Sequence, residues 1–385
     1  MNSEEKDLPE SLARVLKHYA ARSPSVAALV PAPRPFPSAR EWSRASTQQW
    51  AVEHLVRRSP SPSSSSDATS AWEKGFWKRV VQAIEQGFDQ RRDQDGESLE
   101  DEEVEEEILE RMVHHLSAGP GQASISERTY YWGALRDVEQ RDTEWKCVRT
   151  REEARMISGG TTGLRTWQAC IALSNHFLVD PGDVVHSATN VVELGAGVGL
   201  LSLVVAKLKE EGDGSRRPGT VFATDVDDKV LELLDANVRL NGLEARVRTS
   251  RLDWELAGDL DAHGDELSTW ERETFGDDER GRPDLIIGAD IVYDPTLTAQ
   301  LAATIAWLLR PRVDARPLLP PIRAIIAGTI RNESTWQLFL TECRSRRLRV
   351  EDVELRTFRD GSGIVGAEGW EGEGTVRVVR LTRAE

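Results

Sequence analysis

The chain has 385 residues, of which 39% are hydrophobic, and a formal net charge of −16 at pH 7. This length suffices for one large domain and a smaller one. The negative charge argues against nucleic acid as the main partner, because phosphate binding needs dense lysine and arginine. The three cysteines form no C-x-x-C pair and the seven histidines form no H-E-x-x-H motif, so we expect neither a disulfide framework nor a metal site.

No apolar run approaches the ~20 residues that a membrane span needs. The acidic N-terminus Met1–Glu5 also lacks the apolar core of a signal peptide. We therefore expect a soluble, cytoplasmic protein that binds no membrane. Nothing in the sequence indicates an obligate dimer, so we expect a monomer.

Residues 1–150 are predicted to form a small helical domain. Apolar residues at helical spacing predict helices over Leu8–Tyr19, Trp42–Arg57 and Trp72–Phe88. The last of these places an apolar residue at every fourth position, on one face of the helix: Trp72, Phe76, Val80, Ile84 and Phe88.

Polar segments separate these helices. Pro31–Pro37 and Ser59–Ser66 are typical of linkers. Asp93–Glu110 is an acidic run, which fits either a solvated loop or an exposed helix with an acidic face.

Residues 151–385 are predicted to form an α/β domain, because strand and helix patterns alternate from Ile157 onward. We expect seven strands, over Asn190–Leu194, Val221–Thr224, Arg246–Arg251, Asp284–Gly288, Ala324–Gly328, Leu348–Leu355 and Val376–Leu381. Helices are expected over Thr166–Leu178, from Leu200 to about Lys209, and over Asp227–Leu240. Glu211–Gly219 and Ala257–Pro283 are polar and are expected to be loop insertions. The pattern predicts a mostly parallel sheet with helices on both faces, and a ligand at the carboxyl ends of its strands.

The most informative segment is Val191–Leu200, which predicts a buried strand, a tight glycine turn and a helix. Its glycines are spaced G-x-G-x-G and Glu193 comes just before them, whereas a dinucleotide site has G-x-G-x-x-G. Glycines here either let the backbone approach a ligand closely or serve packing alone.

Acidic residues follow the second and third predicted strands. Asp225 is placed to accept both hydroxyls of a ribose, or alternatively to cap the next helix, a role that Asp227 and Asp228 fill equally well. Asp253 and Trp254 suit an adenine amino group and its ring, or alternatively a surface turn with a tryptophan tucked into the core.

Asp290 ends the fourth predicted strand and Tyr293 lies three residues further on. A carboxylate there can orient a substrate amine; the alternative is a capped strand end beside a core tyrosine. The glycine-rich segment Gly159–Gly163 precedes Trp167 and lacks the G-K-[ST] of a phosphate-binding loop. Trp167 itself suits either a cofactor pocket or the core.

Taken together, these segments resemble the seven-strand, Rossmann-like protein-lysine methyltransferases, in the branch that methylates translation elongation factor 2. The resemblance runs from about Ile157 to the C-terminus. It rests on five segments in this order: Ser158–Leu164 with Thr166-Trp167, Val192–Leu200, Leu252-Asp253-Trp254, Asp290–Tyr293 as D-x-x-Y, and Ile330–Glu333 with Gln337–Phe339. The long Ala257–Pro283 segment and the Ser-rich and acidic N-terminal stretches depart from the pattern.

The resemblance implies S-adenosylmethionine (SAM) as cofactor and elongation factor 2 as protein substrate. It assigns the methionine and ribose end of SAM to Glu193, Gly195 and Gly197, and the ribose to Asp225. It places Asp253 and Trp254 at the adenine, and Trp167 and Ala289 along the cofactor pocket. Asp290 and Tyr293 would face the substrate lysine as the catalytic pair.

Two other functions compete with this interpretation. The first is methylation of another protein or of a small molecule, which would not need the D-x-x-Y segment or the N-terminal region. The second is a non-catalytic adaptor with the same fold. An adaptor would be expected to carry a broken glycine turn or to lack Asp225 or Asp290, and all of these are intact.

Overall fold

The structure is a computed structural model. It describes residues 10–22, 37–57, 67–95, 102–117, 125–133, 145–153, 163–182, 188–211, 219–278, 281–311, 322–358, 361–366 and 374–384. Four predicted segments lie outside these residues wholly or for the most part: the two N-terminal linkers, Gly159–Thr162, and the interior of Glu211–Gly219. The chain divides into two compact units. The first comprises Met1–Cys147, Glu152–Met156 and Glu368–Trp370, and the second Val148–Arg151, Ile157–Ala367 and Glu371–Glu385.

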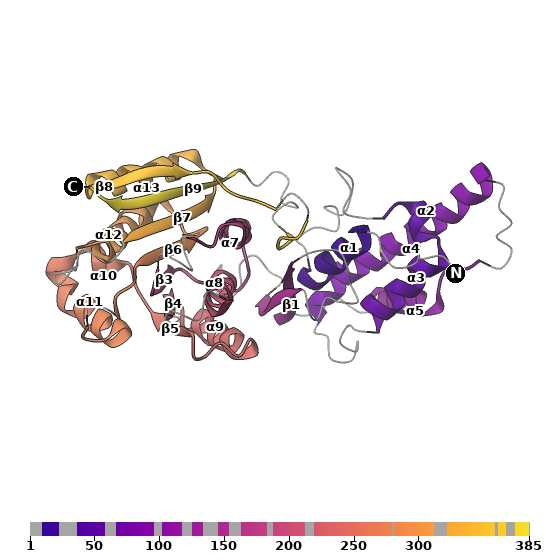
Figure 1. Ribbon diagram of the computed structural model, residues 1–385, viewed down its shortest axis with the longest axis horizontal. Coiled ribbons are helices and arrows are strands. Elements are labelled where there is room, and N and C mark those ends of the chain that lie inside the picture. Colours follow the sequence, from indigo (N-terminus) through magenta and orange to yellow (C-terminus); the bar gives the residue numbers. More distant parts are fainter. Residues whose placement is uncertain are drawn as a thin grey trace. The chain divides into compact units, whose positions relative to one another are not determined.

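The described part of the first unit is mainly helical (Figure 1). Its helices are α1 (Glu10–Ala21), α2 (Ala39–Trp42), α3 (Ala45–Ala51), the π-helical turn η2 (Val52–Val56), α4 (Asp67–Asp95) and α5 (Glu106–Ser117). The helix predicted over Trp42–Arg57 is confirmed from Ala45 to Val56, but its start is wrong, because Trp42 ends the separate short helix α2. The two ends of the acidic run Asp93–Glu110 lie in helices, because α4 ends at Asp95 and α5 begins at Glu106.

The apolar face predicted for α4 is confirmed. Phe76, Val80 and Ile84 are fully buried and Phe88 is 8% exposed, while Trp72 packs against this core from its edge. One residue of this helix, Gly87, carries no side chain, and a Cβ there would lie 2.0 Å from the carbonyl oxygen of Ala39. The glycine thus lets α2 pack directly onto α4.

The sequence did not predict the two-stranded sheet of β1 (Ile125–Trp132) and β2 (Lys146–Glu153). In β1 every second residue is buried, and these include Ser126 and Arg128. Buried polar residues break the apolar alternation that marks a strand in a sequence. Arg128 forms an ion pair with the fully buried Glu152 at 3.6 Å, and Glu152 also accepts a hydrogen bond from the Tyr130 hydroxyl.

The second unit is built on a seven-stranded sheet with the order β5-β4-β3-β6-β7-β9-β8. The strands are β3 (Val191–Leu194), β4 (Val221–Asp225), β5 (Val247–Arg251), β6 (Leu285–Ala289), β7 (Arg323–Thr329), β8 (Leu348–Val353) and β9 (Val376–Arg383). Five strands are parallel, and β9 is antiparallel to β7 and β8. The predicted α/β fold with a seven-strand, Rossmann-like sheet is confirmed.

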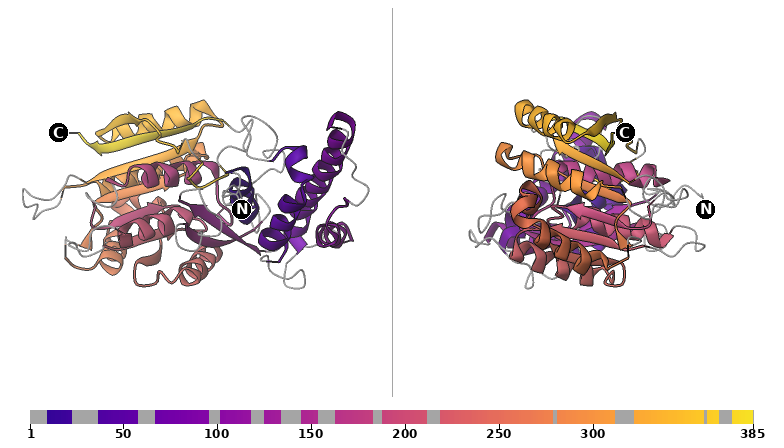
Figure 2. Two further views of the ribbon diagram at one scale, coloured as in Figure 1. Left: turned by 45° about the vertical axis from the view of Figure 1, so that its right-hand side comes forward. Right: turned by 90° about the vertical axis from the view of Figure 1, so that its left-hand side faces the viewer.

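Helices cover both faces of this sheet (Figure 1), and Figure 2 shows the same layers from two further sides. One face carries α7 (Gln168–Val179), α8 (Leu200–Glu211) and α9 (Asp228–Leu240). The other carries α10 (Glu255–Gly258), α11 (Leu260–Phe275), α12 (Thr298–Leu308) and α13 (Glu333–Ser345). None of the helices among the described residues is long and apolar enough to cross a membrane.

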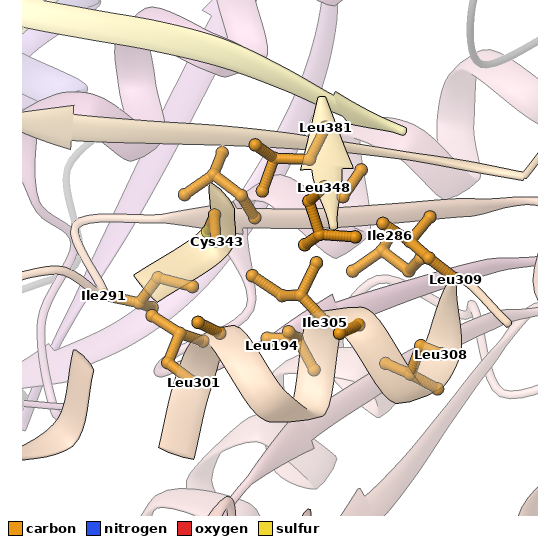
Figure 3. Packing of buried hydrophobic residues seen from close by; sticks show 14 of the residues in the cluster. Leu194, Ile286, Ile291, Leu301, Ile305, Leu308, Leu309, Cys343, Leu348 and Leu381 are labelled. Atoms are coloured by element: carbon orange, nitrogen blue, oxygen red, sulfur yellow. The ribbon is translucent and has the colours of Figure 1, made fainter. Parts of the chain in front are cut away.

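The period-two alternation of strand residues sets which side chains meet which helices. Leu194 and Ile286 point to the α12–α13 side, where Ile305 and Leu348 join them in one apolar cluster (Figure 3). Glu193, between two such residues, points to the opposite face and contacts α8. The alternation therefore places a single carboxylate within an otherwise apolar strand.

The prediction of a loop over Ala257–Pro283 is wrong, because most of the segment forms α11. Its exposed face is polar, which hides the helix in the sequence, but three aromatic or apolar residues anchor it. Leu267 is fully buried, Phe275 meets Phe222 of β4 edge-on at 4.8 Å, and the indole of Trp270 donates to the Ser250 hydroxyl of β5 at 3.0 Å. The α11 helix belongs to the connection between β5 and β6 and packs against β4 and β5 near that edge of the sheet.

Candidate active site

A cavity of about 560 Å³ lies at the carboxyl ends of the central strands, in the size range of small-molecule sites. It is centred on β3 and β6, the point where the strand order reverses. The ten residues predicted for the site all line it: Trp167, Glu193, Gly195, Gly197, Asp225, Asp253, Trp254, Ala289, Asp290 and Tyr293. Their individual roles toward a ligand stay predictions.

The glycine turn forms the floor of the cavity because side chains are excluded there. Gly195, Gly197 and Gly199 have φ of +61°, +54° and +91°, in the left-handed region that favours glycine. A Cβ on Gly195 would lie 2.7 Å from the Ile291 side chain, and one on Gly199 would lie 2.3 Å from Leu234. The turn is closed by a hydrogen bond from the Ala196 N–H to the Thr224 carbonyl of β4 at 2.8 Å.

Glu193 lies under this turn and is 2% exposed. Burial raises the pKa of its carboxyl to about 8, against the hydrogen bond from the Ser202 hydroxyl, which lowers the pKa. The negative charge of Asp225 raises the pKa further. Glu193 is thus a carboxyl whose ionisation lies near neutral pH and depends on the charge of whatever occupies the cavity.

Asp225 ends β4, and its two carboxylate oxygens face backbone donors. Oδ2 accepts from the Gly197 N–H at 3.1 Å, and Oδ1 accepts from the Val226 N–H at 2.8 Å. The alternative role as a helix cap belongs to Asp227, which accepts from the Lys229 and Val230 N–H groups at the start of α9. Asp225 therefore stays at the cavity wall, where burial raises the pKa of its carboxyl.

Asp253 and Trp254 line the other side of the same end. The Asp253 carboxylate accepts from the Glu255 N–H at 3.0 Å and so shapes the turn that leads into α10. A Cβ added to Gly195 would lie 3.5 Å from the Trp254 indole, so that ring lies directly beside the glycine turn. Trp254 is half-buried and forms a wall of the cavity, which combines both alternatives for this residue.

Asp290 turns the chain sharply at the end of β6. Its φ of +56° is uncommon outside glycine, although aspartate tolerates it better than most residues. Its carboxylate is 4% exposed and accepts hydrogen bonds from the Ala169 N–H at 2.8 Å, the Thr329 N–H at 2.7 Å and the Thr329 hydroxyl at 3.1 Å. One side chain thus ties together the ends of β6 and β7 and the start of α7.

The bond to Ala169 replaces a missing helix cap. Trp167 occupies the N-cap position of α7 and has no side-chain hydrogen bond to the helix, so a long-range carboxylate satisfies the first turn instead. Asp290 thereby fixes where Trp167 stands at the cavity. Tyr293 lies at the rim and is 54% exposed.

Two guanidinium groups lie against the Trp167 indole. The Cζ of Arg165 is 5.2 Å and that of Arg331 5.0 Å from the ring centroid, within cation–π range. Arg331 also places Nη1 3.9 Å from Oδ1 of Asp290. The sequence interpretation assigned no role to either arginine, although Arg331 lies in the Ile330–Glu333 segment of the resemblance.

The lining also contains residues that sequence reasoning did not single out. These are Gly163, Arg165, Thr166, Cys170, Ala196, Val198, Leu200, Val226, Asp227, Leu252, Glu255, Ile291, Asp294 and Leu297. Most flank the predicted residues, so the position of a strand end was the signal that could have found them. Among the described lining residues, carboxylates far outnumber arginines, because Arg165 is the single basic one.

Comparison with known proteins identifies the family of this chain. The family model described as lysine methyltransferase matches residues 152–319. Protein-lysine N-methyltransferase EFM3 of Chaetomium thermophilum is 30% identical over 259 residues, which cover 66% of this chain and 69% of that protein. The chain belongs to the lysine methyltransferase family.

Other members of the lysine methyltransferase family are similarly related. Protein-lysine N-methyltransferase EEF2KMT of Homo sapiens is 33% identical over 220 residues, covering 54% of this chain and 58% of that protein. EFM3 of Saccharomyces cerevisiae is 28% identical over 266 residues, covering 66% of this chain and 68% of that protein. The chain thus spans little more than half of the human lysine methyltransferase. All ten predicted site residues fall inside the range of the family match.

Proposed function

We propose that the protein is a SAM-dependent protein-lysine N-methyltransferase that acts on translation elongation factor 2. The observation that carries the proposal is the gathering of all ten predicted residues around one acidic cavity, floored by a glycine turn, in a chain of the lysine methyltransferase family. Elongation factor 2 as substrate is supported by the resemblance of the sequence to that branch and by the similarity to the human EEF2KMT protein. We further propose that the protein works as a monomer in the cytoplasm.

The chemistry of the cavity fits SAM. The cofactor is a cation with a sulfonium, an amino group, a ribose diol and an adenine ring. The lining offers carboxylates for the positive groups and the diol at Glu193 and Asp225, and an indole and a carboxylate for the adenine at Trp254 and Asp253. The absent side chains of Gly195 and Gly197 leave space that any Cβ would occupy. A cation near Glu193 favours the ionised form of that carboxyl, so binding and deprotonation of Glu193 support each other.

When bound, SAM supplies the electrophilic methyl group, and the protein contributes alignment and exclusion of water. The acceptor lysine must arrive as a neutral amine, although a free lysine has a pKa near ~10.4. Asp290 acts as a positioning residue here, since its carboxylate already accepts three hydrogen bonds from Ala169 and Thr329. Its bonds to Ala169 and Thr329 hold Trp167 and the end of β7 at the acceptor side. Tyr293 covers the rim, where it shields the amine from water.

The proposal is tested by methyl incorporation from labelled SAM. Purified elongation factor 2 is incubated with the protein beside other abundant translation factors, and labelled residues are mapped by mass spectrometry. We expect label on one lysine of elongation factor 2, and loss of that label with the Asp290→Ala variant. Measurable SAM binding without label on any protein would contradict the proposal and favour a small-molecule methyltransferase or a non-catalytic adaptor.

A further inference from the structure

The acceptor side of the cavity holds a charge arrangement that the positioning role of Asp290 does not explain. Arg331 follows β7, outside the range of the family match, and its side chain is 37% exposed. The guanidinium spans two groups at once, because it lies 5.0 Å from the Trp167 ring centroid and 3.9 Å from Asp290 Oδ1. A surface arginine with no local task would extend into water, since holding a long side chain against two partners costs conformational entropy.

A carboxylate beside a methyl acceptor poses a problem. The negative charge of Asp290 favours the ammonium form of a lysine that enters the site, whereas only the neutral amine can attack a methyl group. The three hydrogen bonds from Ala169 and Thr329 offset part of that charge, but dipoles do not cancel a full charge. A cation adjacent to Asp290 does.

We propose that Arg331 is a positioning residue that balances the charge of Asp290 and thereby keeps the acceptor lysine neutral. The inference rests on the proposed lysine methyltransferase function. The Trp167 ring helps to hold the guanidinium in place, since a cation over the face of an indole is attracted to its ring electrons. Arg165 lies 5.2 Å from the centroid of the same ring and adds a second positive charge beside it. These two arginines leave the acceptor side less negative than the cofactor end, which is rich in carboxylates.

Six charged or titratable groups face the acceptor side of the cavity, Asp290 and Arg331 included. They come from the turn after β6, from the segment before α7, from the first turn of α7 and from the end of β7: Asp290, Tyr293, Asp294, Arg165, Cys170 and Arg331. Asp294 is already bound to Thr296, whose N–H and hydroxyl it accepts at 2.8 and 2.7 Å. Among the described residues, Arg331 is the cation that forms an ion pair with Asp290.

The first test is the pH dependence of turnover at saturating cofactor and elongation factor 2. Arg331→Gln removes the charge and keeps a polar side chain. A unit charge within roughly 10 Å of the amine, at an effective dielectric constant of about 20 to 40, shifts its ionisation by on the order of one pH unit. We therefore expect the rising limb of the kcat profile to move about one unit toward alkaline pH. Arg331→Met serves as a second neutral variant if Arg331→Gln does not fold.

Two control variants separate charge from shape. Arg331→Lys keeps the charge without the flat stacking surface, and we expect it to retain the wild-type profile even where its turnover is lower. Arg239→Gln removes an equal charge from the last turn of α9, where Arg239 pairs with Asp235 at 3.7 Å, and should leave the profile unchanged. A lower turnover with an unshifted profile in Arg331→Gln, or an equal shift in Arg331→Lys or Arg239→Gln, would overturn the inference.

The second test needs no methyl transfer. The affinity of the protein at pH 7 is compared for elongation factor 2 and for the same protein with its mapped lysine replaced by methionine, an apolar side chain of similar length. We expect Arg331→Gln to bind the lysine form better, relative to the methionine form, by about fivefold to tenfold compared with wild type. An unchanged ratio would refute charge balance by Arg331. The rate of methyl transfer by the wild-type protein tests the proposed function. The differences in pH profile and in binding ratio between wild type and Arg331→Gln test the role of Arg331.

Discussion

The two ends of the cavity are built by opposite means. At the end formed by β3 and β4, the shape comes from side chains that are missing: Gly195 and Gly197 leave a cradle, with the carboxyl of Glu193 buried beneath it and that of Asp225 at the cavity wall. At the end formed by β6 and β7, the shape comes from a side chain that is present and immobilised, since Asp290 joins three elements through one carboxylate.

This difference bears on how each end tolerates change. The glycine end depends on local backbone conformation, so any substitution that adds a side chain acts by occupying space. The Asp290 end depends on contacts between residues far apart in the chain, so substitutions there act through position and charge. The two ends should therefore separate in experiment, the first affecting SAM affinity and the second affecting turnover.

The largest effect is expected from Gly195→Arg. A side chain at φ +61°, with its Cβ 2.7 Å from Ile291, must displace that residue or fill the cavity. We expect SAM affinity to fall by about 100-fold or more, equivalent to about 3 kcal/mol, in calorimetric titration. Gly242→Arg is a matched control, because Gly242 has φ +65° and no heavy atom within 4 Å of an added Cβ. That variant should lose about 1–2 kcal/mol of stability from backbone strain and keep its SAM affinity. Normal titration by Gly195→Arg would refute the assignment of the cofactor end.

Asp290→Ala should separate turnover from cofactor binding. Loss of the carboxylate releases the start of α7 and the end of β7, and misplacement of acceptor-side groups by about 1 Å costs about 100-fold in rate. We expect kcat to fall by about that factor while the SAM dissociation constant changes by less than about threefold. Asp259→Ala, which removes the N-cap of α11 outside the cavity, controls for loss of a helix cap and should keep its turnover. An equal fall in SAM affinity for Asp290→Ala would make the residue purely structural.

The sequence predicts the glycine end of the cavity, but it does not predict the contacts that build the Asp290 end. Buried strands such as Val191–Leu194 and the glycine turn after them are signalled by residues that lie next to one another in the chain. The partners of Asp290 are not signalled in this way, because Ala169 and Thr329 are distant in sequence and contribute mainly backbone N–H groups, which almost any residue carries. The contact of Arg331 with Trp167 likewise depends on the folded sheet.

The same reasoning explains the errors in secondary structure. The α11 helix shows a mostly polar sequence, since its outer face meets water and only a few residues such as Leu267 and Phe275 are buried. The β1 strand was missed because charged residues in it are buried through ion pairs, as with Arg128 and Glu152. In both cases tertiary contacts decide a structure that local patterning does not specify.

Glu193→Gln tests the buried carboxyl of the cofactor end through stability. The pKa of Glu193 is about 8 in the folded protein against 4.5 as its ordinary value. The folded state therefore holds this proton more tightly, and the stability that Glu193 contributes is complete below about pH 4.5 and is lost as pH rises toward 8. The slope reaches about 1.4 kcal/mol per pH unit.

A glutamine has no such ionisation, so the free energy of unfolding of Glu193→Gln should depend less on pH between about 5 and 8. The measurement is urea denaturation without SAM at several pH values. Ser202→Ala is the matched control, because it keeps the carboxyl and removes the hydroxyl that donates to it, and it should retain the dependence on pH. Parallel curves for Glu193→Gln and wild type would contradict a raised pKa.

The smallest effect is expected from Asp253→Ala. A single hydrogen bond to an adenine amino group contributes about 1 kcal/mol, so SAM affinity should fall by about fivefold with little change in kcat. Asp265→Ala removes an exposed carboxylate of α11 outside the cavity lining and should leave the affinity unchanged. A change in kcat without a change in SAM affinity would move Asp253 from the cofactor end to the acceptor end.

The strand order of the sheet has a consequence for how the protein is made. β9 is the last of the seven strands to leave the ribosome, yet it lies between β7 and β8 and pairs with both. Until Val376–Arg383 is synthesised, β7, all seven residues of which are buried in the finished fold, presents an unpaired apolar edge, and β8 has no neighbour. A nascent or truncated chain that stops before Val376 thus carries a strand ready to pair with another molecule. Chaperone capture or aggregation, rather than a partly active enzyme, is the expected fate of such a fragment.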